Sequence, residues 1–166
     1  MANYNPIKVA ADFSERYPGA NPQATEAAMN IVRTADLLVK RIADLVEPFG
    51  LSPSSGLALG ILADAAEPLP PHEIAGRLII SRATVTGLLD SLEKRGYVRR
   101  LPHGTDRRML LIELTESGRQ VAHDFRLVVH QHQTAWLAAF NEQEQRQLIG
   151  LLQRLQAALA EAALTA

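Results

Sequence analysis

The segment from Ser81 to Leu114 constrains the fold most strongly, because it joins a capped amphipathic helix to two strand-like runs. Ser81 is a favourable N-cap, and Gly96 is placed to end the helix in a left-handed conformation. A buried stripe at helical spacing lies between them, made of Val85, Leu88, Leu89 and Leu92. The runs YVRRL and RRMLLIEL flank the turn PHGTD, and this pattern predicts a β-hairpin.

The outward side of the predicted helix is built from small and hydroxyl-bearing residues. At 100° per residue, Ala83 and Gly87 oppose the leucine stripe, with Thr84 and Thr86 beside them. Glycine in mid-helix costs roughly 1 kcal/mol relative to alanine. A plain solvated helix is the simpler explanation, but it favours neither Gly nor Thr. Close approach of another surface gives Gly87 a reason.

The remaining segments predict a mainly helical chain. The expected helices are a short one at about 7–16, a long one over ATEAAMNIVRTADLLVKRIADLVEPFG that Pro48 and Gly50 end, one at about 53–66, a short one within PLPPHEIAGRLII, one at 81–95, one from Thr115 to about Ala139 and a last one that follows Asn141. Asn21 or Thr25 can cap the second of these, which has apolar residues on more than one side and therefore suggests a dimer. The last helix begins with a capping box at Asn141. It carries leucines at near-heptad spacing: Leu148, Leu151, Leu152, Leu155 and Leu159.

Composition narrows the class of protein. The chain has 166 residues, 47% of them hydrophobic, so it can bury a core. It has no cysteine, which excludes disulfides and Cys-ligated metal. No apolar run approaches the roughly 20 residues that span a bilayer, and the N-terminus lacks a secretory pattern. We therefore expect a soluble cytoplasmic protein with no membrane partner.

Positive charge is concentrated in one part of an otherwise acidic chain. Residues 77–108 contain eight Lys or Arg against three acids, a local net charge of +5, whereas the whole chain carries −1. Such a segment is typical of a surface that binds a polyanion, although a solvated surface gives the same count. We interpret Lys94, Arg95, Arg99 and Arg100 as holding phosphates or the dimer.

Short helix, turn, amphipathic helix and basic hairpin are the elements of a winged helix–turn–helix. A helix fits the major groove of DNA and presents its first turns to base edges, while hairpin arginines can enter the minor groove. The predicted DNA-binding residues are Ser81, Arg82, Ala83, Thr84, Thr86, Gly87, Lys94, Asp106, Arg107 and Arg108.

Over about residues 25–160 the chain resembles the MarR family of bacterial transcription regulators. Three segments carry the likeness: SRATVTGLLDSLEKRGYVRR (81–100), which contains the recognition helix, DRRMLLIELTESG (106–118) and the closing NEQEQRQLIGLLQRL. The resemblance implies a homodimer that binds a pseudo-palindromic double-stranded DNA operator, usually as a repressor, and is released by a small aromatic or apolar effector. It also implies that Asp106 holds Arg108 by an ion pair while Arg108 probes the minor groove.

The resemblance suggests three regions. Residues 1–50 would be N-terminal dimerisation helices, 51–114 the winged helix–turn–helix, and 115–166 C-terminal dimerisation helices. The chain departs from the family at Gly87, where many members carry a basic residue. Its inter-helix turn, LIIS, lacks glycine. We therefore expect ordinary backbone angles there, with Ile79 and Ile80 in the core. In the preceding helix we expect Leu57, Ile61 and Leu62 to face inward.

Other functions have weaker support. The five histidines lack the spacing of a metal site, and no nucleophile–base set or phosphate loop points to an enzyme. No metal and no cofactor are expected. Trp136, Phe125 and Phe140 are best explained as core or interface residues, with a ligand pocket as the alternative. A winged helix that binds protein instead of DNA is the remaining alternative, against which the arginine-bearing wing argues.

Overall fold

A computed structural model describes residues 7–104 and 109–164. The chain divides into two compact units, Met1–Phe125 and Arg126–Ala166, and α6 runs from one into the other. The elements in chain order are α1 Phe13–Arg16, α2 Pro22–Val46, the 3-10 helix η1 Glu47–Phe49, α3 Pro53–Asp64, α4 Pro71–Leu78, α5 Arg82–Lys94, β1 Val98–Pro102, β2 Leu110–Leu114, α6 Glu116–Leu137 and α7 Glu142–Leu164.

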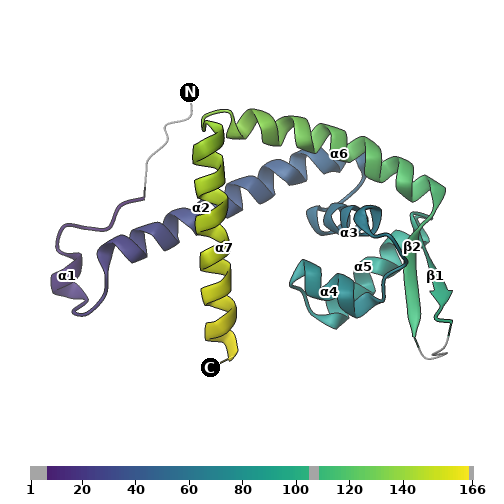
Figure 1. Cartoon of the computed structure of the whole chain (residues 1–166), viewed down its shortest axis with the longest axis horizontal. Coiled ribbons are helices and arrows are strands. Elements are labelled where there is room, and N and C mark those ends of the chain that lie inside the picture. Colours follow the sequence, from purple (N-terminus) through teal and green to yellow (C-terminus); the bar gives the residue numbers. More distant parts are fainter. Residues whose placement is uncertain (1–6, 105–108, 165–166) are drawn as a thin grey trace. The chain divides into compact units, whose positions relative to one another are not determined.

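Helices α3, α4 and α5 pack together in the first unit, with the hairpin beside them (Figure 1). Their starts follow local chemistry. Ser52 and Ser81 each accept a hydrogen bond from a backbone N–H three residues on, at 3.1 Å in both cases. Pro53 and Pro71 occupy first helical positions, where proline's missing N–H costs no hydrogen bond. The predicted winged helix–turn–helix, mainly α with a small hairpin, is confirmed.

One apolar core unites these helices with the hairpin. Side chains from five elements are less than 2% exposed at its centre: Val46, Leu59, Ile74, Val85, Leu89, Leu92 and Ile112. The stripe predicted for α5 supplies three of them, because i, i+4 and i+7 positions share one helix face. These buried aliphatic side chains fix the orientation of α5, the recognition helix, and leave its opposite face uncovered by the core.

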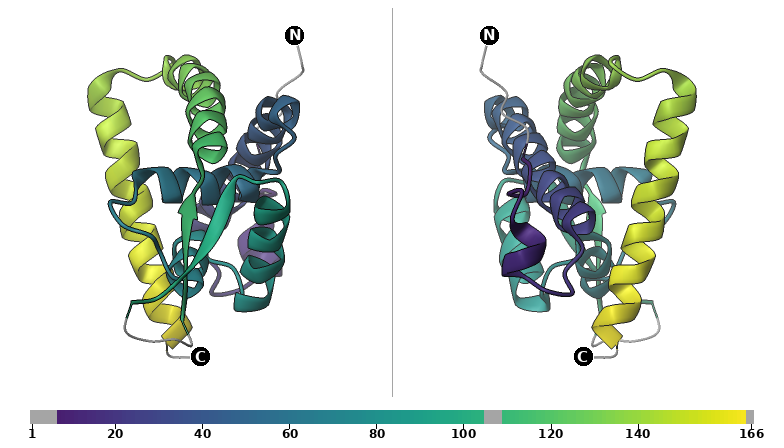
Figure 2. Two further views of the ribbon diagram at one scale, coloured as in Figure 1. Left: turned by 90° about the vertical axis from the view of Figure 1, so that its right-hand side faces the viewer. Right: turned by 90° about the vertical axis from the view of Figure 1, so that its left-hand side faces the viewer.

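Strands β1 and β2 form an antiparallel hairpin (Figure 2). Val98 pairs with Leu114 and Pro102 with Leu110. A third segment joins it. Leu69, between α3 and α4, exchanges two backbone hydrogen bonds with Ile112, at 2.8 and 3.0 Å. The wing is thus attached through its backbone to the chain that leads into α4.

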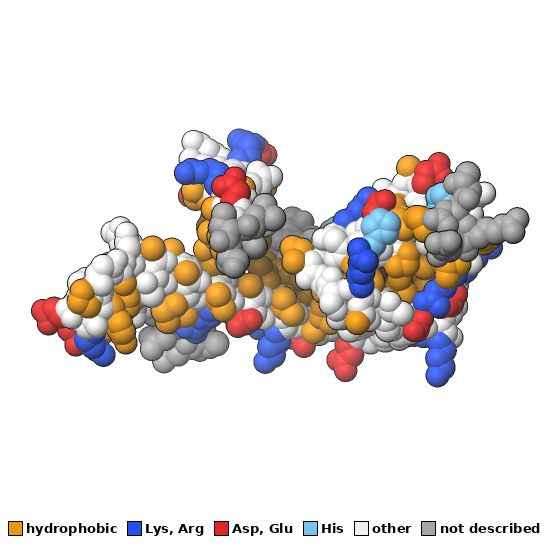
Figure 3. All heavy atoms as spheres, turned by 90° about the horizontal axis from the view of Figure 1, so that it is seen from below, with side chains coloured by type: hydrophobic (Ala, Val, Ile, Leu, Met, Phe, Trp, Pro, Cys, Tyr) orange, Lys and Arg blue, Asp and Glu red, His pale blue; other side chains and the backbone are white. Residues whose placement is uncertain are grey.

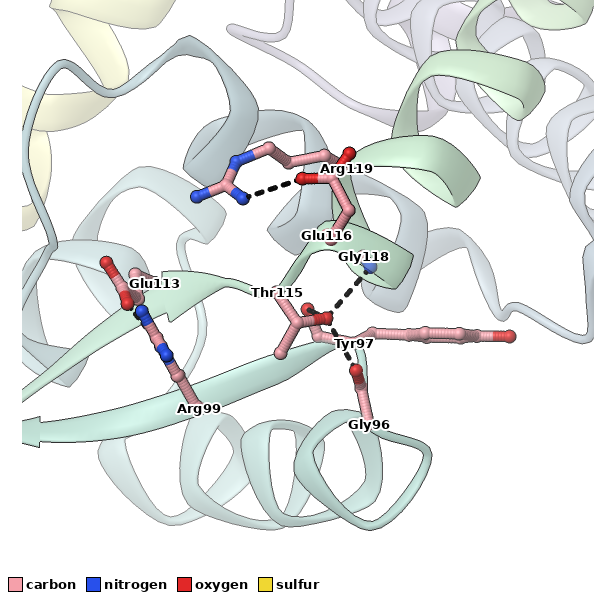
Figure 4. Close-up of polar contacts among 8 residues, drawn as sticks. All are labelled: Gly96, Tyr97, Arg99, Glu113, Thr115, Glu116, Gly118 and Arg119. Atoms are coloured by element: carbon pink, nitrogen blue, oxygen red, sulfur yellow. Dashed lines mark hydrogen bonds and ion pairs between the residues drawn. The ribbon is translucent and has the colours of Figure 1, made fainter.

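The start of α6 is locked to the base of the wing (Figure 4). The Thr115 hydroxyl donates to the Gly96 carbonyl at 2.6 Å and accepts from the Gly118 N–H at 3.0 Å. The Thr115 N–H donates to the Tyr97 carbonyl at 3.0 Å. A Cβ on Gly118 would lie 2.8 Å from the Tyr97 carbonyl carbon and closer still to its oxygen. Only glycine allows this approach.

Two expectations about the helix–turn–helix are wrong. Leu57 is 59% exposed instead of inward, because Ala58, Leu59 and Leu62 form the buried side of α3. Ile79 adopts a left-handed conformation, φ 55° and ψ 44°, and its side chain is 92% exposed. The reason is that α4 ends at Ile79 with left-handed capping geometry, in which the N–H of Ile80 bonds the Ala75 carbonyl at 3.2 Å.

In the second unit, α7 begins with the predicted capping box. The Asn141 side chain accepts from the Glu144 N–H at 3.0 Å, and the Glu144 carboxylate accepts from the Asn141 N–H at 2.8 Å. The leucines predicted to form a stripe on α7 are not buried, and two of them lie mostly in solvent: Leu151 is 60% and Leu159 62% exposed.

Helix α2 of the first unit likewise exposes apolar side chains along its length (Figure 3). They include Met29, Val32, Leu37 and Val39, each at least 45% exposed. Of the two caps predicted for this helix, Asn21 is used, and it accepts from the Ala24 N–H at 3.1 Å. Within the described ranges, no single helix has the length and apolarity to cross a membrane; one pair, Pro22–Phe49 with Pro53–Asp64, reaches them only together and is bent by 77°.

Replacing Gly118 with alanine should destabilise the fold by about 1–3 kcal/mol, the usual cost of overpacking, because the added methyl meets backbone that no rotamer change can move. Urea unfolding measures this. Gly60→Ala in α3 is the matched control, since a Cβ there has no atom within 4 Å in the described structure. The control should be neutral or stabilising. Equal stability of both variants would contradict the close approach of α6.

Candidate nucleic-acid interface

The face of α5 that is predicted to bind DNA is exposed to solvent. Its predicted residues, together with the N-cap, are all exposed: Ser81, Arg82, Ala83, Thr84, Thr86, Gly87 and Lys94. On the opposite side, Val85, Leu89 and Leu92 are at most 1% exposed. Because the buried side fixes the rotation of the helix, the small and hydroxyl-bearing residues can only point outward.

The hydroxyls on this face already make local hydrogen bonds. The Ser81 and Thr84 hydroxyls lie 2.8 Å apart, and the Thr86 hydroxyl donates to the Arg82 carbonyl at 2.9 Å. With its proton engaged, Thr86 offers its methyl group and an acceptor oxygen to an incoming surface. Because the groups on this face are small, another molecule can approach the α5 backbone closely.

Two cations on α5 have no side-chain partner in the described part of the chain. The guanidinium of Arg82 stands in the first turn and the ammonium of Lys94 in the last, and both residues are exposed. The helix is 13 residues long, with Arg82 first and Lys94 last, so the two charges can meet an anionic backbone at well-separated points. Neither is committed to holding the fold.

Gly87 lies in the middle of this face without an internal reason to be glycine. A Cβ built there has no neighbouring heavy atom within 4 Å among the described residues. Gly118 by contrast is required by packing. The absence of a side chain at Gly87 thus leaves the α5 backbone bare toward solvent, where another molecule can approach it closely.

Arg100 links the wing to the recognition helix. From β1 its guanidinium pairs with the Asp90 carboxylate and, at 3.0 Å, with that of Glu93, both on α5. The hydrogen bond with Asp90 raises the pKa of Arg100, against the opposing effect of partial burial, and the charge of Glu93 adds to the rise. The guanidinium stays charged, and the pair sets the wing at a fixed position beside α5.

Arg95 and Arg99 also serve the fold. The Arg95 guanidinium donates to the carbonyls of Gly50 and Phe49, the latter at 3.2 Å, and lies 4.9 Å from the Tyr97 ring centroid. Arg99 pairs with Glu113 across the hairpin (Figure 4). These contacts within the protomer are not anticipated by the interpretation of Arg95, Arg99 and Arg100 as phosphate or dimer contacts, which stays a prediction. Glu113 opposite Arg99, and Asp90 and Glu93 beside Arg100, are the acids in the sequence that could have indicated two of these pairs.

The wing keeps its pairing as far as His103, whose N–H donates to the Met109 carbonyl at 3.0 Å. Asp106, Arg107 and Arg108 fall between these two residues in the sequence and lie outside the described residues. Their assignment to DNA stays a prediction.

Two of the five histidines, His130 and His132, have a ring nitrogen beside an oxygen of their own helix. In α6 the His130 ring nitrogen lies 3.1 Å from the Gln133 side-chain oxygen, and that of His132 lies 2.9 Å from the Val128 carbonyl. Across residues 7–104 and 109–164, no three His, Asp or Glu side chains gather in a way that could hold a metal ion.

Comparison with known proteins agrees with this geometry. The model of the MarR family matches residues 49–109. The transcriptional regulator PecS of Dickeya dadantii is 30% identical over 165 residues, covering 94% of this chain and 96% of PecS. The S. aureus MepR–DNA complex superimposes with a TM-score of 0.75 at 22% identity, over 80% of this chain and 97% of MepR. CouR from Rhodococcus jostii RHA1, bound to p-coumaroyl-CoA, gives 0.70 at 23%, over 78% and 90%. With a relative matched over nearly its whole length and the same winged fold, this chain belongs to the MarR family of transcriptional regulators.

Proposed function

We propose that this DNA-binding regulator acts as a homodimeric repressor of a pseudo-palindromic operator and leaves the DNA when a small effector binds. The observation that carries the proposal is the exposed first half of α5, small and hydroxylated outside and leucine-backed inside. As a family of regulators, MarR proteins are not enzymes.

On DNA, α5 would enter the major groove by its N-terminal turns. Arg82 can donate to guanine or to a phosphate, and Thr84 and Thr86 offer methyls and acceptor oxygens to base edges. Ser81 positions the first turn, while Ala83 and Gly87 let the helix backbone approach. Lys94, at the other end, would hold a phosphate. In the wing, Asp106 would orient Arg108 toward the minor groove and Arg107 would contact phosphate; these three roles follow from the family resemblance.

Dimerisation would bury the apolar faces that each unit exposes. In α2 these include Val32 and Val39, and in α7 Leu151 and Leu159, all more than half exposed. Exposed apolar surface on two long helices is typical of a protein–protein interface. Two copies related by a two-fold axis would present two α5 helices to successive major grooves, about 34 Å apart.

Release requires a ligand that binds the form without DNA more tightly. We propose a small aromatic or apolar effector, on the family resemblance and on the structural neighbour CouR, whose structure contains p-coumaroyl-CoA. A repressor has to work where the chromosome is, so we place the protein in the cytoplasm.

The alternative, a winged helix that binds protein, is not favoured. A protein-binding helix would present an apolar or aromatic centre, whereas this face presents Arg82, Thr84, Thr86 and Gly87. Selection of bound duplexes from a random pool tests both functions at once. The repressor proposal expects an inverted repeat with half-sites about one helical turn apart; a pool that stays random after repeated rounds would reject it.

Gly87→Ala should stabilise the protein by up to roughly 1 kcal/mol, because alanine favours helix and meets no atom there. It should nevertheless weaken operator binding, because the methyl occupies the space that the DNA backbone or a base edge needs. Thermal unfolding and fluorescence titration with the selected operator measure the two effects. Gly60→Ala should stabilise without changing affinity. Unchanged affinity in Gly87→Ala would remove close backbone approach from the mechanism.

Arg82→Ala should weaken operator binding and reduce the slope of log K against log salt by about 1 if the guanidinium meets phosphate. If it reads guanine, the loss should instead concentrate at one base pair per half-site, by about 1–3 kcal/mol. Titrations at several salt concentrations separate these results. Arg146→Ala removes the same charge from α7 and should change neither quantity; an equal effect of both variants would indicate non-specific attraction only.

Leu152→Asp combined with Leu155→Asp should convert the dimer to monomers, because two carboxylates would be buried without partners in the proposed interface. Sedimentation velocity measures the mass. Gln153→Asp, on the far side of α7 by helical periodicity, is the control and should leave the dimer intact. A double variant that still sediments as a dimer would rule out the α7 leucine stripe as the interface.

A further inference from the structure

Ile79, in the turn between α4 and α5, has a backbone conformation that suits its residue type poorly. Its φ of 55° and ψ of 44° lie in the left-handed region, and it is the one non-glycine residue with positive φ that the structure describes. Branching at Cβ makes this region especially unfavourable. Glycine or asparagine is the usual occupant of such a position.

The fold requires the conformation but not the side chain. The N–H of Ile79 and the N–H of Ile80 bond carbonyls in the last turn of α4, at 3.3 Å to Gly76 and 3.2 Å to Ala75, which closes that helix. The Ile79 side chain is 92% exposed, so no burial offsets the conformational cost. Neither backbone geometry nor core packing therefore accounts for an isoleucine here.

The position of Ile79 in the chain suggests why an isoleucine stands here. Ile79 stands two residues before Ser81, the N-cap of α5, and the nearby Arg77, Ser81 and Arg82 are exposed. The side chain thus projects into solvent at the end of the helix that would enter the groove. The C5-methyl of thymine is the apolar group that the major groove offers to such a side chain.

We propose that Ile79 is a specificity-determining residue that contacts a thymine methyl in each operator half-site. The proposal rests on the proposed function, because it needs α5 in a major groove. A contact that forms only in the complex explains why, in the free protein, this residue has a strained backbone and an exposed side chain beside the binding surface.

Deoxyuridine substitution tests the contact, because it removes a thymine methyl and nothing else. Each thymine of the selected operator is replaced in turn, in both half-sites, and the Kd is measured for the wild-type dimer and for Ile79→Asn. For the wild type, one symmetry-related thymine pair should matter, with about a fourfold loss per methyl from the apolar burial forfeited. Ile79→Asn should bind the thymine and deoxyuridine duplexes equally at that pair.

Two further measurements keep the test decisive. Ile79→Asn and Ile79→Gly should unfold at the same or a higher temperature than the wild type, because both suit the left-handed position, so a loss of binding cannot be attributed to misfolding. Leu57→Asn, an exposed leucine of α3, is the control and should keep the wild-type response to deoxyuridine.

The outcomes distinguish a failure of the thymine contact from a failure of the proposed function on which it rests. If selection yields no operator, the proposed function fails. If an operator is found but the wild type responds to no deoxyuridine, or Ile79→Asn keeps the full wild-type response, only the thymine contact is overturned. A uniform loss for Ile79→Asn on every duplex would place Ile79 against the sugar–phosphate backbone and also overturn it.

Discussion

The winged domain depends on the contact between the first turn of α6 and the peptide unit of Tyr97. Thr115 bonds the end of the recognition helix through the Gly96 carbonyl, and Gly118 brings the α6 backbone against the Tyr97 carbonyl. One short segment therefore joins the end of α5, the start of the wing and the helix that leads into the second unit. A change in the direction of α6 would act directly on the base of the wing.

Charge in the basic segment is divided between two tasks. Arg95 bonds carbonyls at the end of η1, Arg100 pairs the hairpin with acids of α5, and Arg99 pairs with Glu113 across the hairpin. Arg82 and Lys94 face outward without partners among the described side chains. The local excess of positive charge thus overstates what the helix can offer to DNA, because part of it is neutralised inside the protomer. The remaining cations sit at the two ends of α5, where backbone phosphates can be met.

Local chemistry made much of the fold predictable. Ser81, Asn141 and Gly96 act as their types predict, because caps and the α5 stripe depend on residues within a few positions. Long-range features were not accessible to that reasoning. The pairing of Leu69 with Ile112 depends on the position of β2 beside the segment between α3 and α4, and no residue near Leu69 in the sequence predicts it. The exposure of the α5 face was foreseen from periodicity; the contacts its residues make with DNA remain predictions.

Two positions of the helix–turn–helix, Ile79 before α5 and Gly87 within it, hold residues that make the free protein less stable than other residue types would. Gly87 has room for a side chain that would favour the helix, and Ile79 occupies a conformation that glycine or asparagine would adopt at lower cost. Packing demands neither choice, whereas it does demand Gly118. Local rules that fail without an internal reason point to an external one. Both positions belong to the helix–turn–helix: Ile79 lies two residues before the N-cap of α5, and Gly87 lies on the exposed face of that helix. We therefore infer that Gly87 and Ile79 serve contact with a bound molecule, at the expense of the stability of the free protomer.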